Sequence, residues 1–185
     1  MVNDSQLRRV NDFLASAEAH ALAQLSAGIS RRRVLDELCL AIESLASERM
    51  LVSILLLTED QKYLKHGAAP SLPAEYSAAV DGLEIGIKAG SCGTAAFCRH
   101  AIFVVDIESD PLWDEFRDVA RPHGLRACWS VPLIDEQGKL HGTFAIYHTW
   151  PRSPSPSERD LISRAAVVVT DVLTADDRQK GKRVG

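Results

Sequence analysis

The sequence of 185 residues contains no long uninterrupted hydrophobic run. Its longest apolar stretch, residues 51–57, is interrupted by Ser53 and is too short to cross a bilayer. Residues 1–9 also lack the apolar core of an export signal. These absences predict a cytoplasmic protein without a membrane partner.

The net charge of the sequence is small. The formal charge is −4, whereas proteins that bind nucleic acids usually carry a clustered excess of Lys and Arg that neutralises phosphates. The one basic cluster, residues 31–33, stands at a predicted helix start and is interpreted as a solvated helix face. We therefore expect no nucleic-acid partner.

Cysteine is scarce, and the common catalytic and metal-binding motifs are missing. The spacing of the four cysteines matches no zinc site, and without an export signal we expect reduced thiols. The acidic residues of 106–118 lack the fixed spacing of a calcium loop, and there is no Gly-x-Ser-x-Gly elbow of a hydrolase. The sequence therefore predicts no metal site and no catalytic residues.

The residues that are present predict one globular domain, because 46% are hydrophobic and 25% are charged. An apolar stripe at helical spacing runs through residues 5–26 and ends at Gly28. A second helix is expected from Ser30 to about Ser47. We divide the chain into an amino-terminal helix (1–29) that dimerises, a main domain (30–175) and a flexible polar tail (176–185).

The middle of the sequence alternates between strand patterns and short helices. The last helix has two adjacent apolar seams. Together they form an apolar stripe that is wider than packing on a single sheet requires. It should therefore meet a partner helix, either the first helix of this chain or that of a second copy. The order predicts an α+β fold, an antiparallel sheet with helices on one face and loops on the other. The expected strands are 50–57, 63–68, 101–105, 125–134 and 140–148, and the expected helices are 74–81, 93–97, 112–120 and one that follows a capping box at 155–158.

An ordered series of motifs runs through most of the chain, and it resembles the GAF domain family of the type attached to bacterial sensor kinases and cyclic-dinucleotide enzymes. The resemblance extends from residue 30 to residue 173. It implies an antiparallel sheet of about six strands, terminal helices that form a dimerising bundle, and a small-molecule pocket on the opposite face. The motifs are Gly90-Ser91-Cys92-Gly93-Thr94-Ala95-Ala96, Val104-Val105-Asp106-Ile107, Asp110-Pro111-Leu112-Trp113, Gly124 to Leu133, and Gly142-Thr143-Phe144-Ala145.

The resemblance implies a sensor whose output lies in another protein or in a portion outside this sequence. It names neither a ligand nor a cofactor, because GAF domains bind many different molecules. No cysteine stands in a context that resembles bilin attachment, and the Asn-Lys-x-Asp-Glu stretch of cyclic-nucleotide-binding members is missing. Whether the chain is a separate protein or part of a larger sensor stays open.

The candidate ligand-binding residues begin at Ser91, Cys92, Gly93 and Thr94. Free backbone N–H groups at a helix start can hold a small anion, and the hydroxyls can add hydrogen bonds. The alternative is that Cys92 is a small buried hydrophobic residue and the glycines serve a tight turn.

The aromatic side chains of Trp113, Phe116 and Trp129 are candidates for the walls of a pocket, where they could stack on a planar ligand. The alternative is that these side chains fill the core. Arg126 is a candidate cationic donor. Because strand residues alternate, Arg126 and Cys128 share one side of the 125–134 strand, and Trp129 lies on the other. Which side faces the pocket stays open.

An enzymatic alternative comes from free methionine-(R)-sulfoxide reductase, a GAF enzyme whose Gly-x-Cys-Gly-Thr-Ala segment matches the segment around Cys92. The attacking cysteine of that enzyme lies about a dozen residues before a Leu-Pro, where this chain has Ala120 ahead of Pro132. We therefore expect a sensor and not an enzyme. A redox module that uses Cys92 with Cys128, and a domain that only dimerises, are the alternatives.

Overall fold

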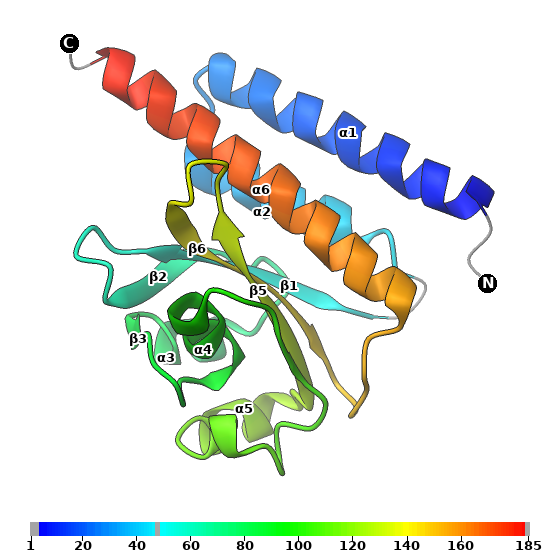
Figure 1. The fold of residues 1–185 in the computed structure, drawn as a ribbon, viewed down its shortest axis with the longest axis vertical. Coiled ribbons are helices and arrows are strands. Elements are labelled where there is room, and N and C mark those ends of the chain that lie inside the picture. The colour runs from blue at the N-terminus through cyan, green and yellow to red at the C-terminus, as the bar shows by residue number, and fades with distance from the viewer. Residues whose placement is uncertain (1–3, 47–48, 184–185) are drawn as a thin grey trace.

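A computed structural model describes residues 4–46 and 49–183. Within these residues, six strands form one antiparallel sheet that lies between two layers of helices (Figure 1). The order of the strands across the sheet is β3-β2-β1-β6-β5-β4. The strands are β1 (Leu51–Leu57), β2 (Tyr63–Ala68), β3 (Leu83–Glu84), β4 (Ile102–Val104), β5 (Ala127–Ile134) and β6 (Leu140–His148).

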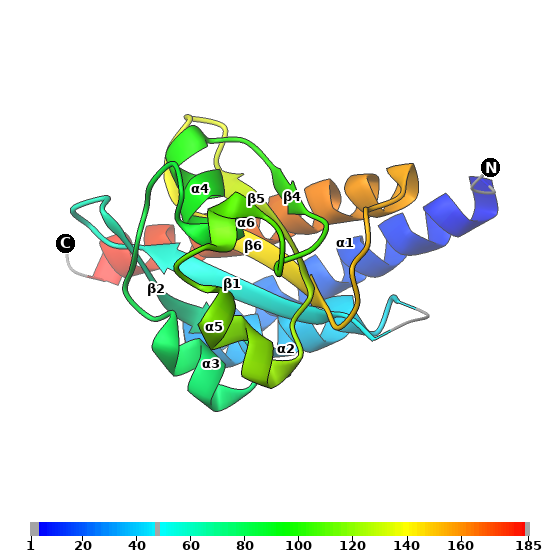
Figure 2. The same cartoon turned by 90° about the horizontal axis from the view of Figure 1, so that it is seen from below.

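Three long helices lie on one side of the sheet, where two of them pack on the strands and the first helix of the chain packs mainly on those two (Figures 1 and 2). They are α1 (Asp4–Ser26), α2 (Arg31–Glu43) and α6 (Pro156–Arg183). Both apolar seams of α6 are buried, because α6 packs on the sheet and against α1 and α2 of the same chain. The wide apolar stripe of the last helix is therefore explained by the first helix of this chain. Its buried residues are Ile162, Ala165, Ala166, Val168, Val169, Val172 and Leu173.

Short helices and loops cover the opposite face of the sheet (Figure 2). The elements are α3 (Ala74–Ala79), α4 (Gly90–Cys98), α5 (Arg117–Ala120) and two 3-10 turns, Pro111–Trp113 and Arg121–His123. A second hydrophobic core lies between these elements and the sheet. The predicted α+β fold, with helices on one face and a loop-rich layer on the other, is confirmed.

Local sequence signals account for the start of α6 and for the turn between β5 and β6. The backbone N–H of Ser155 donates to Glu158 Oε2 over 2.8 Å, and the N–H of Glu158 donates to Ser155 Oγ over 3.3 Å, which confirms the predicted capping box of α6. Gly138 has a φ of +79°, as expected for the glycine of the hairpin turn between β5 and β6. Both predictions depended only on neighbouring residues.

Gly142 is the point at which β6 approaches β1 most closely. A Cβ atom at this position would lie 1.9 Å from the carbonyl oxygen of Leu55, and φ is +154°. Glycine is therefore required for the two central strands to pair here.

The boundaries of some elements differ from the prediction. Helix α4 begins at Gly90 and not at Gly93, and the expected helix 112–120 is divided into shorter turns. The tail predicted to be flexible from residue 176 is helical through Arg183, because Arg31 of α2 binds Asp176 and Asp177. The predicted end of the second helix at Ser47 lies outside the described residues, as do residues 1–3 and 184–185.

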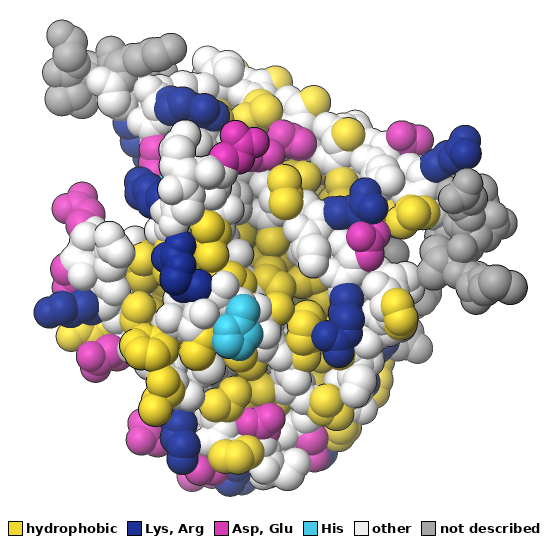
Figure 3. Space-filling model, in the orientation of Figure 1, with side chains coloured by type: hydrophobic (Ala, Val, Ile, Leu, Met, Phe, Trp, Pro, Cys, Tyr) yellow, Lys and Arg dark blue, Asp and Glu magenta, His cyan; other side chains and the backbone are white. Residues whose placement is uncertain are grey.

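The surface carries charges of both signs. Figure 3 shows Lys and Arg side chains interspersed with Asp and Glu over one face, with hydrophobic side chains scattered between them. None of the described helices combines the length and the apolar character needed to cross a membrane.

Candidate functional site

A small pocket lies between the amino-terminal end of α4 and the loop-covered face of the sheet, and we call it the α4 pocket. Its volume is about 20 Å³, which is room for about one water molecule. The walls come from strands β1 and β6 and from the segments around α3, α4 and the Pro111–Trp113 turn. The lining residues are Leu55, Tyr76, Val80, Leu83, Ala89, Gly90, Ser91, Cys92, Trp113, Phe116 and Tyr147.

A chain of buried hydrogen bonds connects three elements at this pocket. Trp113 Nε1 donates to Ser91 Oγ over 3.1 Å, and Ser91 Oγ donates to the carbonyl oxygen of Cys128 over 3.0 Å. All three residues are buried. The loop, α4 and β5 are thereby tied together, since breaking either bond would leave a buried polar atom without a partner.

Two tyrosines form another part of the wall. Tyr76 Oη donates to Tyr147 Oη over 3.3 Å, and their rings meet edge to face with centroids 5.7 Å apart. Tyr147 Oη lies 3.9 Å from the sulfur of Cys92. Burial raises the pKa of both phenols well above the ordinary value, so both stay protonated and can donate hydrogen bonds.

The two thiols at the pocket differ in acidity. A hydrogen bond from the Cys128 thiol is the main reason that the pKa of Cys92 falls to about 7 despite burial. The hydroxyls of Ser130, Tyr147 and Thr143 lower this pKa further. Burial, followed by the neighbouring Cys92, raises the pKa of Cys128 well above the ordinary value. Cys92 is therefore the thiol of this pair that ionises near neutral pH.

Three buried hydroxyls lie on the side of the sheet that faces this pocket. Ser53 of β1 and Ser130 of β5 both stand opposite Ala145 of β6, and Thr143 is two residues away on β6. Within the described residues, their side-chain oxygens make no hydrogen bond of ordinary geometry. A buried hydroxyl without a partner costs roughly 1–3 kcal/mol. Ser130 and Thr143 thus act on the acidity of Cys92 without a bond of ordinary geometry, and Ser53 lies on the same face of the sheet.

Of the residues predicted to bind a ligand, Ser91, Cys92, Trp113 and Phe116 line the α4 pocket. Gly93 and Thr94 do not. The N–H of Gly93 donates to Ala89 O over 3.0 Å, and Thr94 Oγ1 accepts from the N–H of Ala89 over 3.1 Å. Because the helix starts earlier than predicted, these groups are used within the turn, and their role in binding a small anion stays a prediction.

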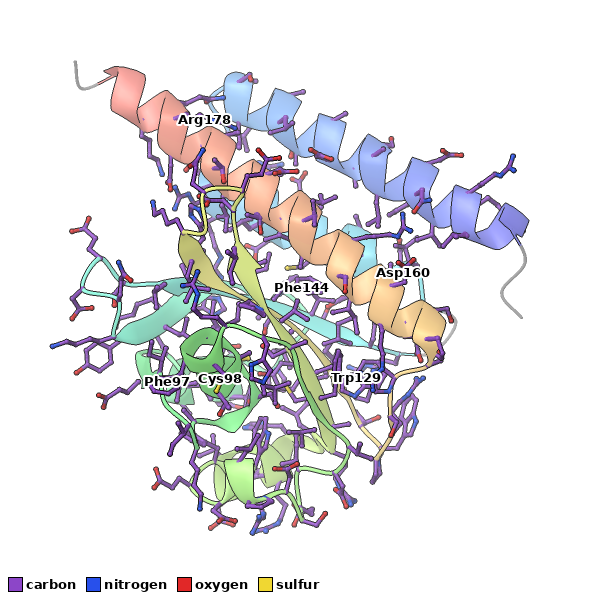
Figure 4. The ribbon with its side chains drawn as sticks, viewed as in Figure 1. Phe97, Cys98, Trp129, Phe144, Asp160 and Arg178 are labelled. Atoms are coloured by element: carbon purple, nitrogen blue, oxygen red, sulfur yellow. The ribbon has the colours of Figure 1, made fainter. Side chains whose placement is uncertain are left out.

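Trp129 and Arg126 also lie away from this pocket. Trp129 belongs to the core on the helical face, together with Phe144 (Figure 4), so it does not line the α4 pocket, and its role in ligand binding stays a prediction. Arg126 binds Asp106 over 3.1 Å and is partly exposed. The side of β5 that carries Cys128 faces the pocket.

Several wall residues were missed by the sequence analysis. Tyr147 shares its side of β6 with Thr143 and Ala145, so strict alternation along the 140–148 strand could have identified it. Tyr76 comes from α3, which the sequence marked only as a short helix. Its place in the wall depends on how α3 folds over the sheet. Among the described residues, no group of three or more His, Cys, Asp or Glu side chains is placed to hold a metal ion.

Comparisons with known proteins identify the family and the fold of the chain. Residues 28–174 match the family model of the GAF domain. The chain is 32% identical over 180 residues to the methyl sulfide methyltransferase-associated sensor of Methanosarcina acetivorans. That match covers 94% of this chain but only 18% of the relative.

Two solved structures share the fold at low sequence identity. Free methionine-R-sulfoxide reductase from Neisseria meningitidis, in complex with its substrate, is 14% identical with a TM-score of 0.72, and the match covers 97% of this chain and 96% of that one. The GAF domain of a phosphoenolpyruvate-protein phosphotransferase from Coxiella burnetii is 15% identical with a TM-score of 0.69, covering 91% and 96%. The family match, the sheet order and the two helical layers lead to one conclusion: the chain belongs to the GAF domain family.

Proposed function

We propose that this domain is a cytoplasmic, non-enzymatic sensory module that binds a small molecule in the α4 pocket and passes the occupancy of that pocket to α1 and α6. The observation that carries the proposal is a small pocket in which apolar and aromatic walls surround a few hydrogen-bonding groups. That combination is typical of small-molecule sites. The 32% identity to a protein described as a sensor supports the same reading.

The lining of the α4 pocket indicates the chemistry of the ligand. None of its described lining residues carries a formal charge at neutral pH apart from the ionisable Cys92 thiol. A compact, uncharged molecule that accepts a hydrogen bond from the Tyr147 hydroxyl fits such walls, because the protons of Ser91 and Trp113 are already donated within the protein. An ion would lose its hydration without gaining an opposite charge.

Binding requires the pocket to open. Pockets for small molecules usually measure about 300–1,000 Å³, whereas this one is about 20 Å³. The cover formed by α3, β3 and residues 85–89 packs on the pocket through Tyr76, Val80 and Leu83, and its movement would create space. Occupancy then favours the open state in proportion to the difference in affinity between the two states.

The sheet connects the pocket to the helices. Cys128 and Tyr147 face the α4 pocket, while their neighbours Trp129 and Ile146 pack in the core below α6. A shift of β5 or β6 on ligand binding therefore changes the packing of α6. The chain spans about 18% of the relative's length, and we propose that the output lies outside it and is reached through a homodimer of these helices.

A variant with a filled pocket tests this function. Val80→Trp at the pocket wall should abolish the thermal stabilisation that a ligand from a library of purines and other uncharged metabolites produces in the unaltered protein. Ile87→Trp, in the same segment but 67% exposed, should retain it. Stabilisation that persists in Val80→Trp would overturn the α4 pocket as the sensor site, and no stabilisation by any compound would favour a domain that only dimerises.

A thiol redox function is the second candidate, and it is favoured by the buried Cys128 thiol beside Cys92, whose pKa is lowered to about 7 chiefly by Cys128. The Cys92 thiolate would attack a peroxide, which releases one water and leaves a sulfenic acid. The Cys128 thiol would then displace a second water and form a disulfide. Mass spectrometry after treatment with hydrogen peroxide should show the loss of two hydrogens, and both Cys92→Ser and Cys128→Ser should prevent it. An unchanged mass in the unaltered protein would remove this candidate.

A further inference from the structure

A second and larger cavity lies on the opposite face of the sheet, and we call it the helix-face cavity. Its volume is about 410 Å³, within the usual range for small-molecule sites. Residues of α1, α6 and the ends of β5 and β6 surround it. The lining residues are Leu7, Val10, Leu45, Ala46, Met50, Trp129, Ile146, His148, Arg152, Ser155, Ser157, Glu158, Asp160, Leu161 and Ile162.

His148, in the wall of this cavity, is a buried polar side chain that lacks a hydrogen-bond partner among the described residues. It is only 3% exposed. Within the described residues, neither its Nδ1 nor its Nε2 makes a hydrogen bond. Buried polar atoms are nearly always satisfied in folded proteins, and an exception calls for an explanation. A hydrogen-bonding ligand in the cavity would supply the missing partner.

Aromatic rings hold the imidazole in place. The ring of Trp129 lies 4.3 Å from that of His148, and the ring of Trp150 lies 5.6 Å away, both measured between centroids. Trp129 is itself fixed, because its Nε1 donates to the carbonyl oxygen of Arg152 over 3.2 Å. The imidazole is therefore held by two tilted ring contacts, and within the described residues its two buried nitrogens have no hydrogen-bond partner, so a ligand must displace neighbouring atoms slightly to reach them.

The charges around the cavity favour an uncharged occupant. Burial is the main reason that the pKa of His148 falls to about 4, so the ring is neutral at pH 7 and offers one N–H donor and one nitrogen acceptor. Arg152 forms an ion pair with Glu158, and Asp160 pairs with Arg164 over 2.7 Å. These charged side chains thus compensate one another and provide no excess charge for an ionic ligand.

We propose that the helix-face cavity is a second binding site, which takes an uncharged heteroaromatic molecule that hydrogen-bonds His148 through an N–H or O–H group. Its apolar body would contact Val10 of α1 and Leu161 of α6. A ligand here would lie between the two helices that carry the signal to the rest of the protein. It would act on α1 and α6 directly and not through the sheet.

Indole is a suitable probe, because it is uncharged, planar and has one N–H donor. We expect saturable binding of indole by isothermal titration calorimetry. His148→Phe should weaken it about tenfold, which corresponds to the loss of one hydrogen bond of about 1.4 kcal/mol. Phe preserves the ring and removes two buried unpartnered nitrogens, so this variant should fold at least as well as the unaltered protein.

Two further variants identify where the probe binds. Val10→Trp should fill the helix-face cavity and abolish binding, whereas Val80→Trp in the α4 pocket should leave the affinity for indole unchanged. The absence of saturable binding, or equal affinity in His148→Phe, would overturn the proposal. So would loss of binding in Val80→Trp alone, because indole would then occupy the α4 pocket.

Discussion

His148 and Cys92 are buried on opposite faces of one sheet, and each departs from its ordinary acidity for a different reason. His148 loses hydration without gaining a partner, so its pKa falls to about 4. Cys92 is surrounded by hydrogen-bond donors, so its pKa falls to about 7. At the scale of single residues, the neighbours of a buried group thus decide which of its protonation states the fold stabilises.

We predict that His148 makes the domain sensitive to moderate acid. The unfolded state has the ordinary histidine pKa of 6.5, and the folded state has a pKa of about 4. The unfolded state therefore binds more protons between these values, and the free energy of unfolding falls as the pH drops from about 6.5 to 4. The full loss is up to about 3 kcal/mol.

Urea unfolding at pH 7 and pH 4.5 checks this prediction. The loss of stability on acidification should be smaller in His148→Phe than in the unaltered protein, while substitution of the exposed His20 by Gln should not change it. Equal losses in all three proteins would contradict a lowered pKa at His148.

The central strands β1 and β6 depend on one glycine. In Gly142→Ala the new Cβ would overlap the carbonyl oxygen of Leu55 at 1.9 Å, so the paired backbones must separate. We expect a loss of about 3 kcal/mol or more in the free energy of unfolding.

Gly138→Ala is the matched control for this substitution. Gly138 also has a positive φ, but nothing lies within 4 Å of its Cβ position, so we expect only about 1 kcal/mol from backbone strain. If chemical denaturation gave equal losses for the two variants, the close approach of the strands would not be the cause.

The carboxyl-terminal turns of α6 are held by charged residues of another element. Arg31 of α2 binds Asp176 and Asp177, and Asp176 also accepts from Lys180 over 2.7 Å. We predict that Arg31→Ala accelerates amide hydrogen exchange in residues 174–183 and changes the free energy of unfolding by about 1 kcal/mol or less.

Arg32→Ala should leave exchange in these residues unchanged, because Arg32 pairs with Asp36 inside α2. Unaltered exchange in Arg31→Ala would show that the last turns of α6 do not depend on this ion pair.

At the scale of the whole molecule, each chain covers its own apolar helix seam. Helix α1 occupies the side of α6 that a second copy could otherwise have covered. Among the described side chains of α6, Val167 is the large hydrophobic residue that stays exposed, at 59%. A homodimer of the kind we propose must therefore use the outer surface of α6 around Val167.

We predict that Val167→Glu weakens self-association at least tenfold in sedimentation equilibrium, because a buried unpaired carboxylate is costly at an apolar contact. Leu40→Glu is the control, since Leu40 is similarly exposed but lies on α2. Dimerisation that survives Val167→Glu and fails in Leu40→Glu would place the interface on α2.

The sequence by itself determined the order of the elements apart from the two-residue strand β3, and also the hairpin turn, the helix cap and the family. Each of these depends on neighbouring residues or on an ordered series of motifs. The alternation of side chains along the 125–134 strand also assigned Cys128 and Trp129 to opposite faces of the sheet. It left open which of the two faces lines the pocket. Only packing against the two helical layers decides that question, because both faces of the sheet are buried and apolar.

Only the tertiary structure determines which residues line the two cavities. It brought Tyr76 of α3 to Tyr147 of β6, 71 positions apart, and Val10 of α1 to the cavity that contains His148. It also extended α6 beyond the predicted end at residue 175, because Arg31 lies 145 positions from Asp176. Periodicity describes one element at a time, and contacts between distant elements depend on how those elements pack in three dimensions.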